Sequence, residues 1–221
     1  RAARRSPLLP AADPAPAFRS AWERSPDRPW LGAEYWANPL QDWRLAGGRI
    51  ECLTAAFDRH VHLITRQLAP RPGTLAMRVR LGRAGGGPLA GQGSAGFRIG
   101  ILGTLQDHPD LHDYRNNLWS QPSSGLYAGL AAEGTLFIGS AGAPGAVALD
   151  LNRASLELRL AVAPAGRTST ATLTALDPAT GRELARTSAD GLAADSLVGH
   201  LALACNFPTD GAGALPARGK A

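Results

Sequence analysis

The sequence predicts an all-β fold, built as a two-sheet antiparallel β-sandwich. Short runs in which apolar and polar residues alternate recur along the chain, and turn residues separate them. The composition agrees, with 26 glycines and 17 prolines among 221 residues. Because no helical period accompanies these runs, we expect hairpin-connected strands that stack as two sheets.

The clearest strand is expected where Leu75, Met77, Val79 and Leu81 alternate with small or charged residues. Such alternation is typical of a strand with one face in a core and the other in solvent. Other strands are expected at residues 43–45, 49–53, 61–68, 97–101, 126–130, 135–138, 156–162, 168–176, 183–187 and 197–204. The first two of these flank a glycine pair that permits the positive φ of a tight hairpin turn.

One domain is expected at residues 22–205, since a β-sandwich of this length commonly has a single core. Residues 1–21 begin with basic residues and prolines, lack the apolar region of an intact signal peptide, and are expected to be a disordered leader or linker. Residues 206–221 are expected to be a C-terminal tail. No run of about 18 apolar residues occurs, so no membrane span is expected.

The net charge of +5 raises the question of a nucleic-acid partner. Lysine occurs only at Lys220, and the arginines are dispersed along the chain. Nucleic-acid binding needs basic residues gathered on one face. We therefore expect no nucleic-acid partner.

Large aromatic residues are concentrated near the N-terminus, at Trp22, Trp30, Tyr35, Trp36 and Trp43. One interpretation is a flap whose rings close one edge of the core, since buried aromatics contribute strongly to packing. The other is a platform on which a sugar ring stacks, which requires exposed tryptophan. The candidate ligand-binding residues are Trp36, Trp43, Tyr114 and Trp119.

The densest polar cluster lies in residues 103–121, and long polar loops often carry function. Oxygen and imidazole ligands for a divalent cation are offered there by Asp107, His108, Asp110, His112 and Asp113. Their spacing matches no defined metal signature, and Pro109 prevents a helical histidine pair. The loop either holds a cation or forms hydrogen bonds within itself, and no other cofactor is expected.

Two pairs of chemically active side chains lie outside this loop. His60 and His62 are two residues apart in an expected strand, so their side chains share one face and could bind a zinc ion, with Asp58 joining them. The alternative is two polar positions on a sheet, because no third firm ligand is evident. Cys52 and Cys205 could form a disulfide in an oxidising compartment or remain small buried thiols.

No complete catalytic motif is present. Glycoside hydrolysis needs a pair of carboxylates, whereas the glutamates that would serve are scattered singly and the E-x-D-x-x-E signature of lectin-fold glucanases is absent. The G-x-S-x-G turn of serine hydrolases is absent as well.

Three runs resemble the N-terminal lectin-like region that precedes the catalytic domain in some bacterial alkaline phosphatase D-type metallophosphoesterases: WLGAEYWANPLQDWRLAGGRIEC, HVHLITRQL and DYRNNLWSQPSSGLYAGLAAEGTLFIG. The resemblance spans about residues 30–205. It implies a concanavalin A-like jelly roll, a non-catalytic accessory or carbohydrate-binding role with a glycan as ligand, and a secreted, periplasmic or cell-surface location.

The same resemblance implies a covalently linked catalytic domain. The phosphoesterase runs G-D-x-x-D and G-N-H-[DE] are absent, so no catalytic role carries over to any residue of this chain. The family continues beyond the position of Cys205 into another aromatic-rich strand, so residues 206–221 are expected to be a truncated end of the domain.

A more distant resemblance supplies the enzyme alternative. The Asp-Trp-x-Leu-x-x-Gly-x-Ile-Glu-Cys run is similar to the opening hairpin of the 3-keto-disaccharide hydrolase-like domains, which share the lectin-like sandwich. That function would place Glu51, His60 or His62 in an acidic or metal-bearing cleft. If the aromatic cluster, His60 and His62 are instead buried and no cleft gathers carboxylates, the accessory role is favoured. An open groove that they line together with Asp107 or His112 would favour an enzyme.

Overall fold

The structure is a computed structural model that describes residues 17–71, 73–85, 93–104, 119–120, 125–142 and 149–207. Its strands are β1 (Tyr35–Asn38), β2 (Trp43–Ala46), β3 (Arg49–Cys52), β4 (His60–Leu68), β5 (Leu75–Leu81), β6 (Ser94–Ile101), β7 (Gly103–Thr104), β8 (Trp119–Ser120), β9 (Leu126–Ala131), β10 (Leu136–Ile138), β11 (Ala141–Gly142), β12 (Leu156–Ala165), β13 (Thr168–Leu176), β14 (Glu183–Ala193) and β15 (Gly199–Asn206). The described helices are short 3-10 turns, η1 (Trp22–Arg24), η2 (Leu40–Asp42) and η3 (Ala194–Leu197).

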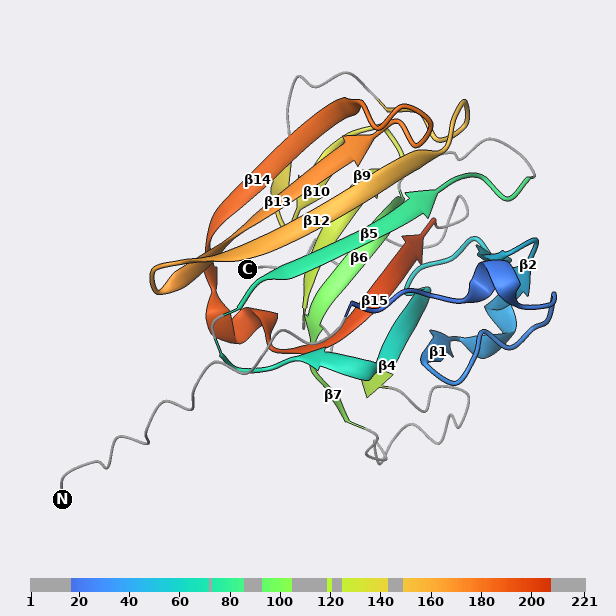
Figure 1. Cartoon of the computed structure of the whole chain (residues 1–221), viewed down its shortest axis with the longest axis horizontal. Helices are drawn as coiled ribbons and strands as arrows, with labels where there is room; N and C mark the ends of the chain where they lie inside the picture. Colours follow the sequence, from blue (N-terminus) through green and yellow to red (C-terminus); the bar gives the residue numbers. More distant parts are fainter. Residues whose placement is uncertain are drawn as a thin grey trace.

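The predicted all-β fold is confirmed. A seven-stranded antiparallel sheet has the order β1-β4-β15-β6-β9-β10-β11, and a four-stranded antiparallel sheet has the order β14-β13-β12-β5. Figure 1 shows the two sheets as stacked layers, with the four-stranded sheet in front. Two further pairs, β2 with β3 and β7 with β8, form separate two-stranded sheets. None of the described helices has the length and apolar character needed to cross a lipid bilayer.

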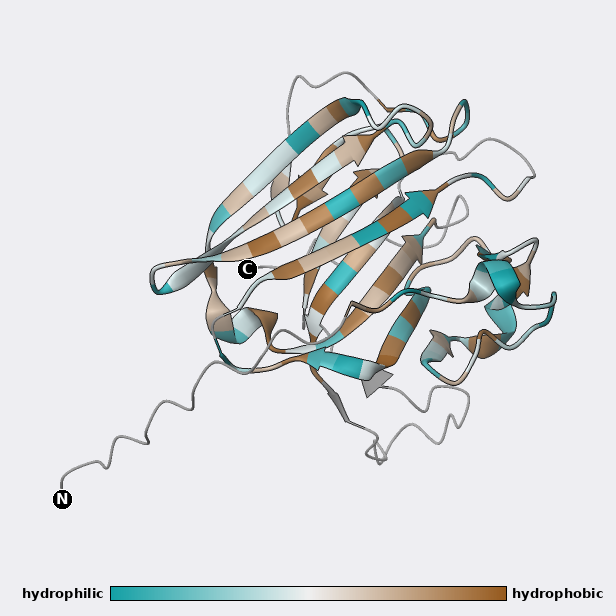
Figure 2. Cartoon of the chain, viewed as in Figure 1, coloured by the Kyte–Doolittle hydropathy of each residue, from teal (hydrophilic) through white to brown (hydrophobic). Residues whose placement is uncertain are grey.

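The four-stranded sheet follows directly from sequence alternation. On β12, Leu156, Leu158 and Leu160 are buried, whereas Arg159 and Ala161 are exposed. Figure 2 shows the same alternation of apolar and polar residues along the strands of this sheet. The apolar face packs against the inner face of the seven-stranded sheet and forms the main core.

The last strand, β15, lies in the middle of the seven-stranded sheet. It pairs with β4 on one side and β6 on the other, although both precede it by long stretches of sequence. Leu201 belongs to the main core and Leu203 packs against its border. The alternate residues Ala202 and Ala204 therefore face outward, away from the four-stranded sheet.

The hairpin formed by β2 and β3, called here the N-terminal hairpin, is a separate two-stranded sheet that packs against the large sheet at β1, β4 and β15. Its turn is Gly47–Gly48, with φ of 56° and 74°, as the glycine pair predicts. Trp43 and Leu45 point inward and join Val61 of β4 in a second apolar cluster. Figure 1 shows β2 of this hairpin at the right of the molecule, near β1.

Some elements differ from the sequence-based expectation. The sequence predicts no strand at Tyr35 to Asn38, whereas the structure has strand β1 there, on the edge of the large sheet. Phe18, inside the expected leader, contacts the Tyr35 ring at a centroid distance of 6.1 Å. Residues 1–16 and 208–221, which hold most of the expected leader and tail, lie outside the described residues.

Candidate functional site

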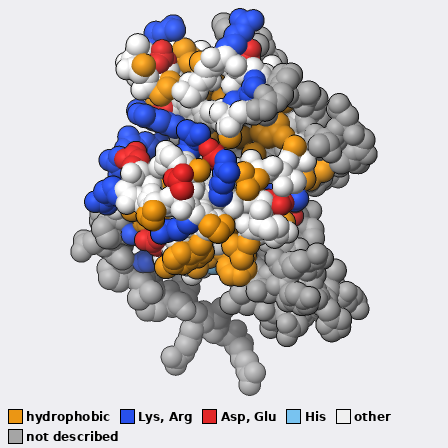
Figure 3. All heavy atoms as spheres, turned by 90° about the vertical axis from the view of Figure 1, so that its right-hand side faces the viewer, with side chains coloured by type: hydrophobic (Ala, Val, Ile, Leu, Met, Phe, Trp, Pro, Cys, Tyr) orange, Lys and Arg blue, Asp and Glu red, His pale blue; other side chains and the backbone are white. Residues whose placement is uncertain are grey.

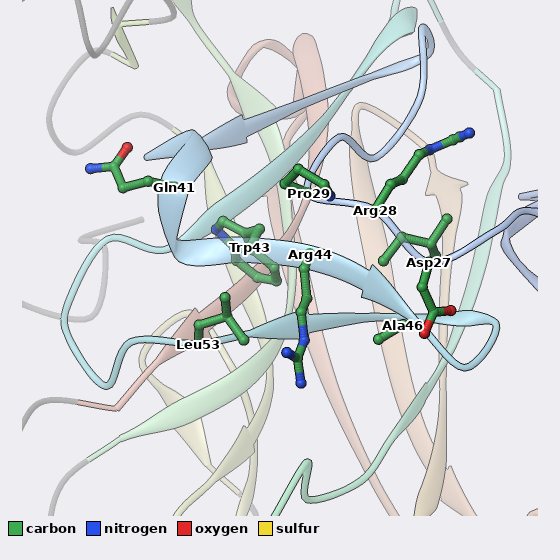
Figure 4. Close-up of a pocket in the computed structure, with 9 residues that line it drawn as sticks. Asp27, Arg28, Pro29, Gln41, Trp43, Arg44, Ala46 and Leu53 are labelled. Atoms are coloured by element: carbon green, nitrogen blue, oxygen red, sulfur yellow. The ribbon is translucent and has the colours of Figure 1, made fainter.

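The candidate site is a shallow depression on the N-terminal hairpin, called here the hairpin depression. Its volume is about 320 Å³, which is the lower end of the range for small-molecule sites. Its lining consists of Asp27, Arg28, Pro29, Gln41, Trp43, Arg44, Leu45, Ala46 and Leu53. In Figure 4, Pro29 and Trp43 lie toward the middle of the group, and Gln41, Arg28 and Arg44 extend outward.

The segment before β1 is fixed along the free edge of β2. Arg28 and Leu45 exchange two backbone hydrogen bonds, of 2.9 and 2.8 Å. The Gly47 backbone N–H also donates to Asp27 Oδ1 at 2.8 Å. These contacts hold the lining residues from two separate segments in one place, so the depression is built from rigid backbone.

Trp30 supplies an exposed ring in the segment that lines the depression. It directly follows lining residues Arg28 and Pro29, and 54% of its surface is exposed. The Arg28 guanidinium lies over this ring at 5.2 Å, and its Nε donates to the Trp30 carbonyl oxygen at 2.8 Å. The ring is therefore oriented by its neighbour while it stays open to solvent.

The outward face of the hairpin carries a charge network. The carboxylate of Glu51 accepts hydrogen bonds from Arg44 at 2.8 Å and from Arg49 at 2.7 and 3.0 Å. The hydrogen bond from Arg44 is the main cause that holds the pKa of Glu51 below its usual value. Figure 3 shows arginine side chains on this side of the molecule with single carboxylates between them. Glu51 is thus committed to ion pairing.

Trp43 packs in the second cluster and is 4% exposed, so its ring is a core element of the hairpin. Trp36, on β1, is half-buried, and its Nε1 is shielded from solvent. The exposed tryptophan of this region is Trp30. It belongs to the N-terminal group of aromatic residues but is not one of the ligand-binding residues predicted from the sequence. These three tryptophans differ in how far they are buried, and sequence alone does not show burial.

A second polar group, called here the histidine cluster, lies on the outer face of the seven-stranded sheet. It consists of His60 and His62 on β4, Arg98 on β6 and Tyr127 on β9. His62, Ala202, Arg98 and Tyr127 occupy one row across adjacent strands. The expectation that His60 and His62 share a face is confirmed, since their ring centroids are 5.7 Å apart.

Small residues let these side chains meet across the sheet. His60 Nε2 lies 3.0 Å from the Tyr127 hydroxyl, although β15 and β6 run between their two strands. The residues in between on this face include Ala204 and Gly96, and a Cβ at Gly96 would collide with the neighbouring strand's backbone. Ala and Gly thus form a flat floor over which the two rings reach.

The histidine cluster is sealed from solvent. His60 and His62 are 0% and 1% exposed, and neither nitrogen of His62 has a hydrogen-bond partner. Burial is the main cause that lowers the pKa of both histidines to about 3, and the nearby Arg98 charge lowers each further. Burial raises the pKa of Tyr127 to about 12. All three rings are therefore neutral at physiological pH.

Most candidate residues of the polar loop at 103–121 fall outside the described ranges. Asp107, His108, Asp110 and His112 lie outside the described residues, as does Tyr114. Trp119 is described only as a backbone position in β8. Within the part of the chain that the structure describes, no group of three His, Cys, Asp or Glu side chains is placed to hold a metal ion.

The residues of the enzyme alternative are held in separate networks. Glu51 is bound by Arg44 and Arg49, whereas His60 interacts with Tyr127 and lies 3.2 Å from Asp58 Oδ1 through its Nδ1, without the alignment of a hydrogen bond. No described cleft gathers these side chains.

Comparisons with protein-family models, curated proteins and solved structures found no match to this chain.

Proposed function

We propose that this chain is a non-catalytic binding module whose ligand is a carbohydrate, bound at the hairpin depression and the adjacent Trp30 ring. The observation that carries the proposal is the exposed Trp30 ring, which stacks with lining residue Arg28 of an open, largely apolar depression that also carries a few polar side chains. An indole ring offers an apolar face to the C–H side of a sugar. Asp27, Gln41 and Arg44 offer donors and acceptors suited to hydroxyl groups.

The histidine cluster is a poorer candidate for the binding site than the hairpin depression. The histidine cluster has donors and acceptors, but its histidines are shielded from solvent, so a sugar has no access to them in this structure. The hairpin depression has access, an oriented aromatic ring and a rigid backbone. These features agree with ligand sites, which are usually concave, largely pre-formed and lined in part by aromatic side chains.

The resemblance to lectin-like regions of alkaline phosphatase D-type enzymes supports a wider proposal. In it, the module is exported and acts beside a metallophosphoesterase domain of the same polypeptide. A coding sequence that continues into the G-D-x-x-D and G-N-H-[DE] runs would support this arrangement, and one without them would remove it. The isolated chain is expected to hydrolyse no phosphodiester, with or without added divalent metal.

A glycan array followed by calorimetric titration of the strongest ligand tests the binding proposal. Trp30→Ala is expected to weaken binding about fivefold, since one aromatic contact contributes about 1 kcal/mol. The matched control is Ile64→Ala, which shortens another exposed apolar side chain away from the depression. Circular dichroism checks that both variants fold. An array without any bound glycan, or equal binding by both variants, would overturn the proposal.

A further inference from the structure

Cys52 and Cys205 meet between the N-terminal hairpin and the seven-stranded sheet. Cys52 ends β3, directly across the hairpin from Trp43, and Cys205 lies near the end of β15. Both side chains are partly buried and pack against the second apolar cluster. The fold therefore brings together two thiols that are far apart in the sequence.

Strand alternation explains why the two side chains point into the same space. Cys205 is two positions beyond Leu203, so both side chains lie on the inner face of β15. Leu203 packs against the second cluster, which also contains Trp43.

Cys52 Sγ donates to the Thr54 carbonyl oxygen at 3.4 Å, and the Cys205 backbone N–H donates to the Arg59 carbonyl oxygen at 2.8 Å. Asp42 joins these two segments, because it accepts from Thr54 Oγ1 at 3.0 Å and pairs with Arg59 at 2.6 Å, so the two cysteines are neighbours in the fold.

This proximity makes the two thiols chemically unequal. The hydrogen bond from Cys205 lowers the pKa of Cys52, whereas the hydrogen bond to Cys52, followed by burial, raises the pKa of Cys205. Arg59, whose Nε lies 2.6 Å from Asp42 Oδ2, places positive charge near both sulfurs. Cys52 is thus the thiol that ionises first and acts as the nucleophile.

We propose that Cys52 and Cys205 form a disulfide bond that fastens the N-terminal hairpin to β15. The oxidant is a low-molecular-weight disulfide such as oxidised glutathione. The Cys52 thiolate attacks one of its sulfurs, forms a mixed disulfide and releases one glutathione thiolate. Cys205 then loses its proton and attacks Cys52 Sγ, which releases the second glutathione thiolate. The two electrons and two protons lost by the protein end on two molecules of reduced glutathione.

The bond would join the layer that holds the hairpin depression to the middle of the large sheet. Without it, the hairpin is held by the second cluster and by the Arg59–Asp42 ion pair. A disulfide that closes a loop this long strongly restricts the unfolded chain, so the oxidised protein is expected to melt about 10 °C above the reduced protein. Its formation does not depend on sugar binding.

The test incubates the purified full chain with reduced and oxidised glutathione at fixed ratios. Acid quenching, alkylation of free thiols and intact mass analysis then count the remaining thiols. The wild-type chain is expected to lose both thiols together as a monomer, and to keep the bond in an excess of reduced glutathione. Cys205→Ser is expected to stop at a mixed disulfide between Cys52 and glutathione, whereas Cys52→Ser, which keeps only the less reactive Cys205 thiol, is expected to react more slowly.

If either variant fails to fold, two measurements on the wild-type protein still test the disulfide proposal. Peptide mapping of the oxidised chain must recover Cys52 joined to Cys205, and thermal melts must separate the oxidised from the reduced form. Two alkylated thiols after full oxidation, a stable adduct of the wild type with glutathione, or a disulfide-linked dimer would each overturn the proposal.

Discussion

The hairpin depression and the histidine cluster are both built from aromatic and polar side chains, yet they differ in access and in charge. At the hairpin, Glu51 is satisfied by two arginines and the Trp30 ring remains open to solvent. On the outer face of the large sheet, His60 and His62 are enclosed and their pKa values fall to about 3. Strongly shifted pKa values therefore mark burial here, and accessibility identifies the better candidate for binding.

Acidification is expected to have the largest effect, and to act through the histidine cluster. In the unfolded chain, histidine binds a proton below pH about 6.5, whereas folded His60 and His62 stay neutral down to about 3. Between these values the unfolded state holds more protons, so stability falls as the pH falls. Each histidine contributes about 1.4 kcal/mol per pH unit across this window.

Urea unfolding between pH 7 and about 4 measures this slope. His62→Leu, which replaces the ring with an apolar side chain, is expected to remove about half of the histidine contribution. An unchanged slope in this variant would show that carboxylates, rather than the histidine cluster, set the acid sensitivity. The buried histidines would then not distinguish the two regions by their effect on the pH dependence of stability.

Removal of the Trp43 ring is expected to cost about 4 kcal/mol of unfolding free energy, because the ring is buried in the second cluster. Trp30→Ala should cost less than about 0.5 kcal/mol, since that ring is largely exposed. Chemical denaturation of both variants measures the difference. Equal losses would mean that Trp30 is a packing residue and would weaken its assignment to a binding surface.

Sequence alone could predict the strands of the four-stranded sheet, because their alternation is a local property. The run around Leu75 to Leu81 and the run around Leu156 to Val162 appear as β5 and β12. Their pairing with each other could not be predicted, since the chain between them crosses to the other sheet and back. The position of β15 between β4 and β6 is non-local in the same way.

The candidate site could be predicted only in part. The aromatic concentration pointed to the N-terminal segment, but residue type does not say which ring is exposed, and Trp30 rather than Trp43 is open to solvent. The i, i+2 spacing of His60 and His62 correctly placed both on one face. Their contact with Tyr127 depends on strand order, which no local pattern contains.

Two arginines, one in the histidine cluster and one on the N-terminal hairpin, allow the two regions to be compared at single charged side chains. Arg98 is 3% exposed and lies over the Tyr127 ring at 5.0 Å, so Arg98→Ala is expected to destabilise the fold by about 3 kcal/mol through lost packing and lost charge interactions. Arg44→Ala on the hairpin should cost under about 1 kcal/mol, because Arg49 still pairs with Glu51. Urea midpoints at neutral pH give both values. A larger loss for Arg44→Ala than for Arg98→Ala would mean that the hairpin charge network contributes more to stability than Arg98 of the histidine cluster does.

A smaller effect than that of Arg98→Ala is expected when one hydrogen bond is removed inside the histidine cluster. Tyr127→Phe removes the hydroxyl that lies 3.0 Å from His60 Nε2 but keeps the ring beneath Arg98 and beside His60. Because His60 is fully buried, its Nε2 is left without that partner, and a loss of about 1 kcal/mol is expected. Urea denaturation at neutral pH measures the loss. If the variant is as stable as the wild type, His60 has enough freedom to find another partner, and the cluster is looser than its enclosure implies.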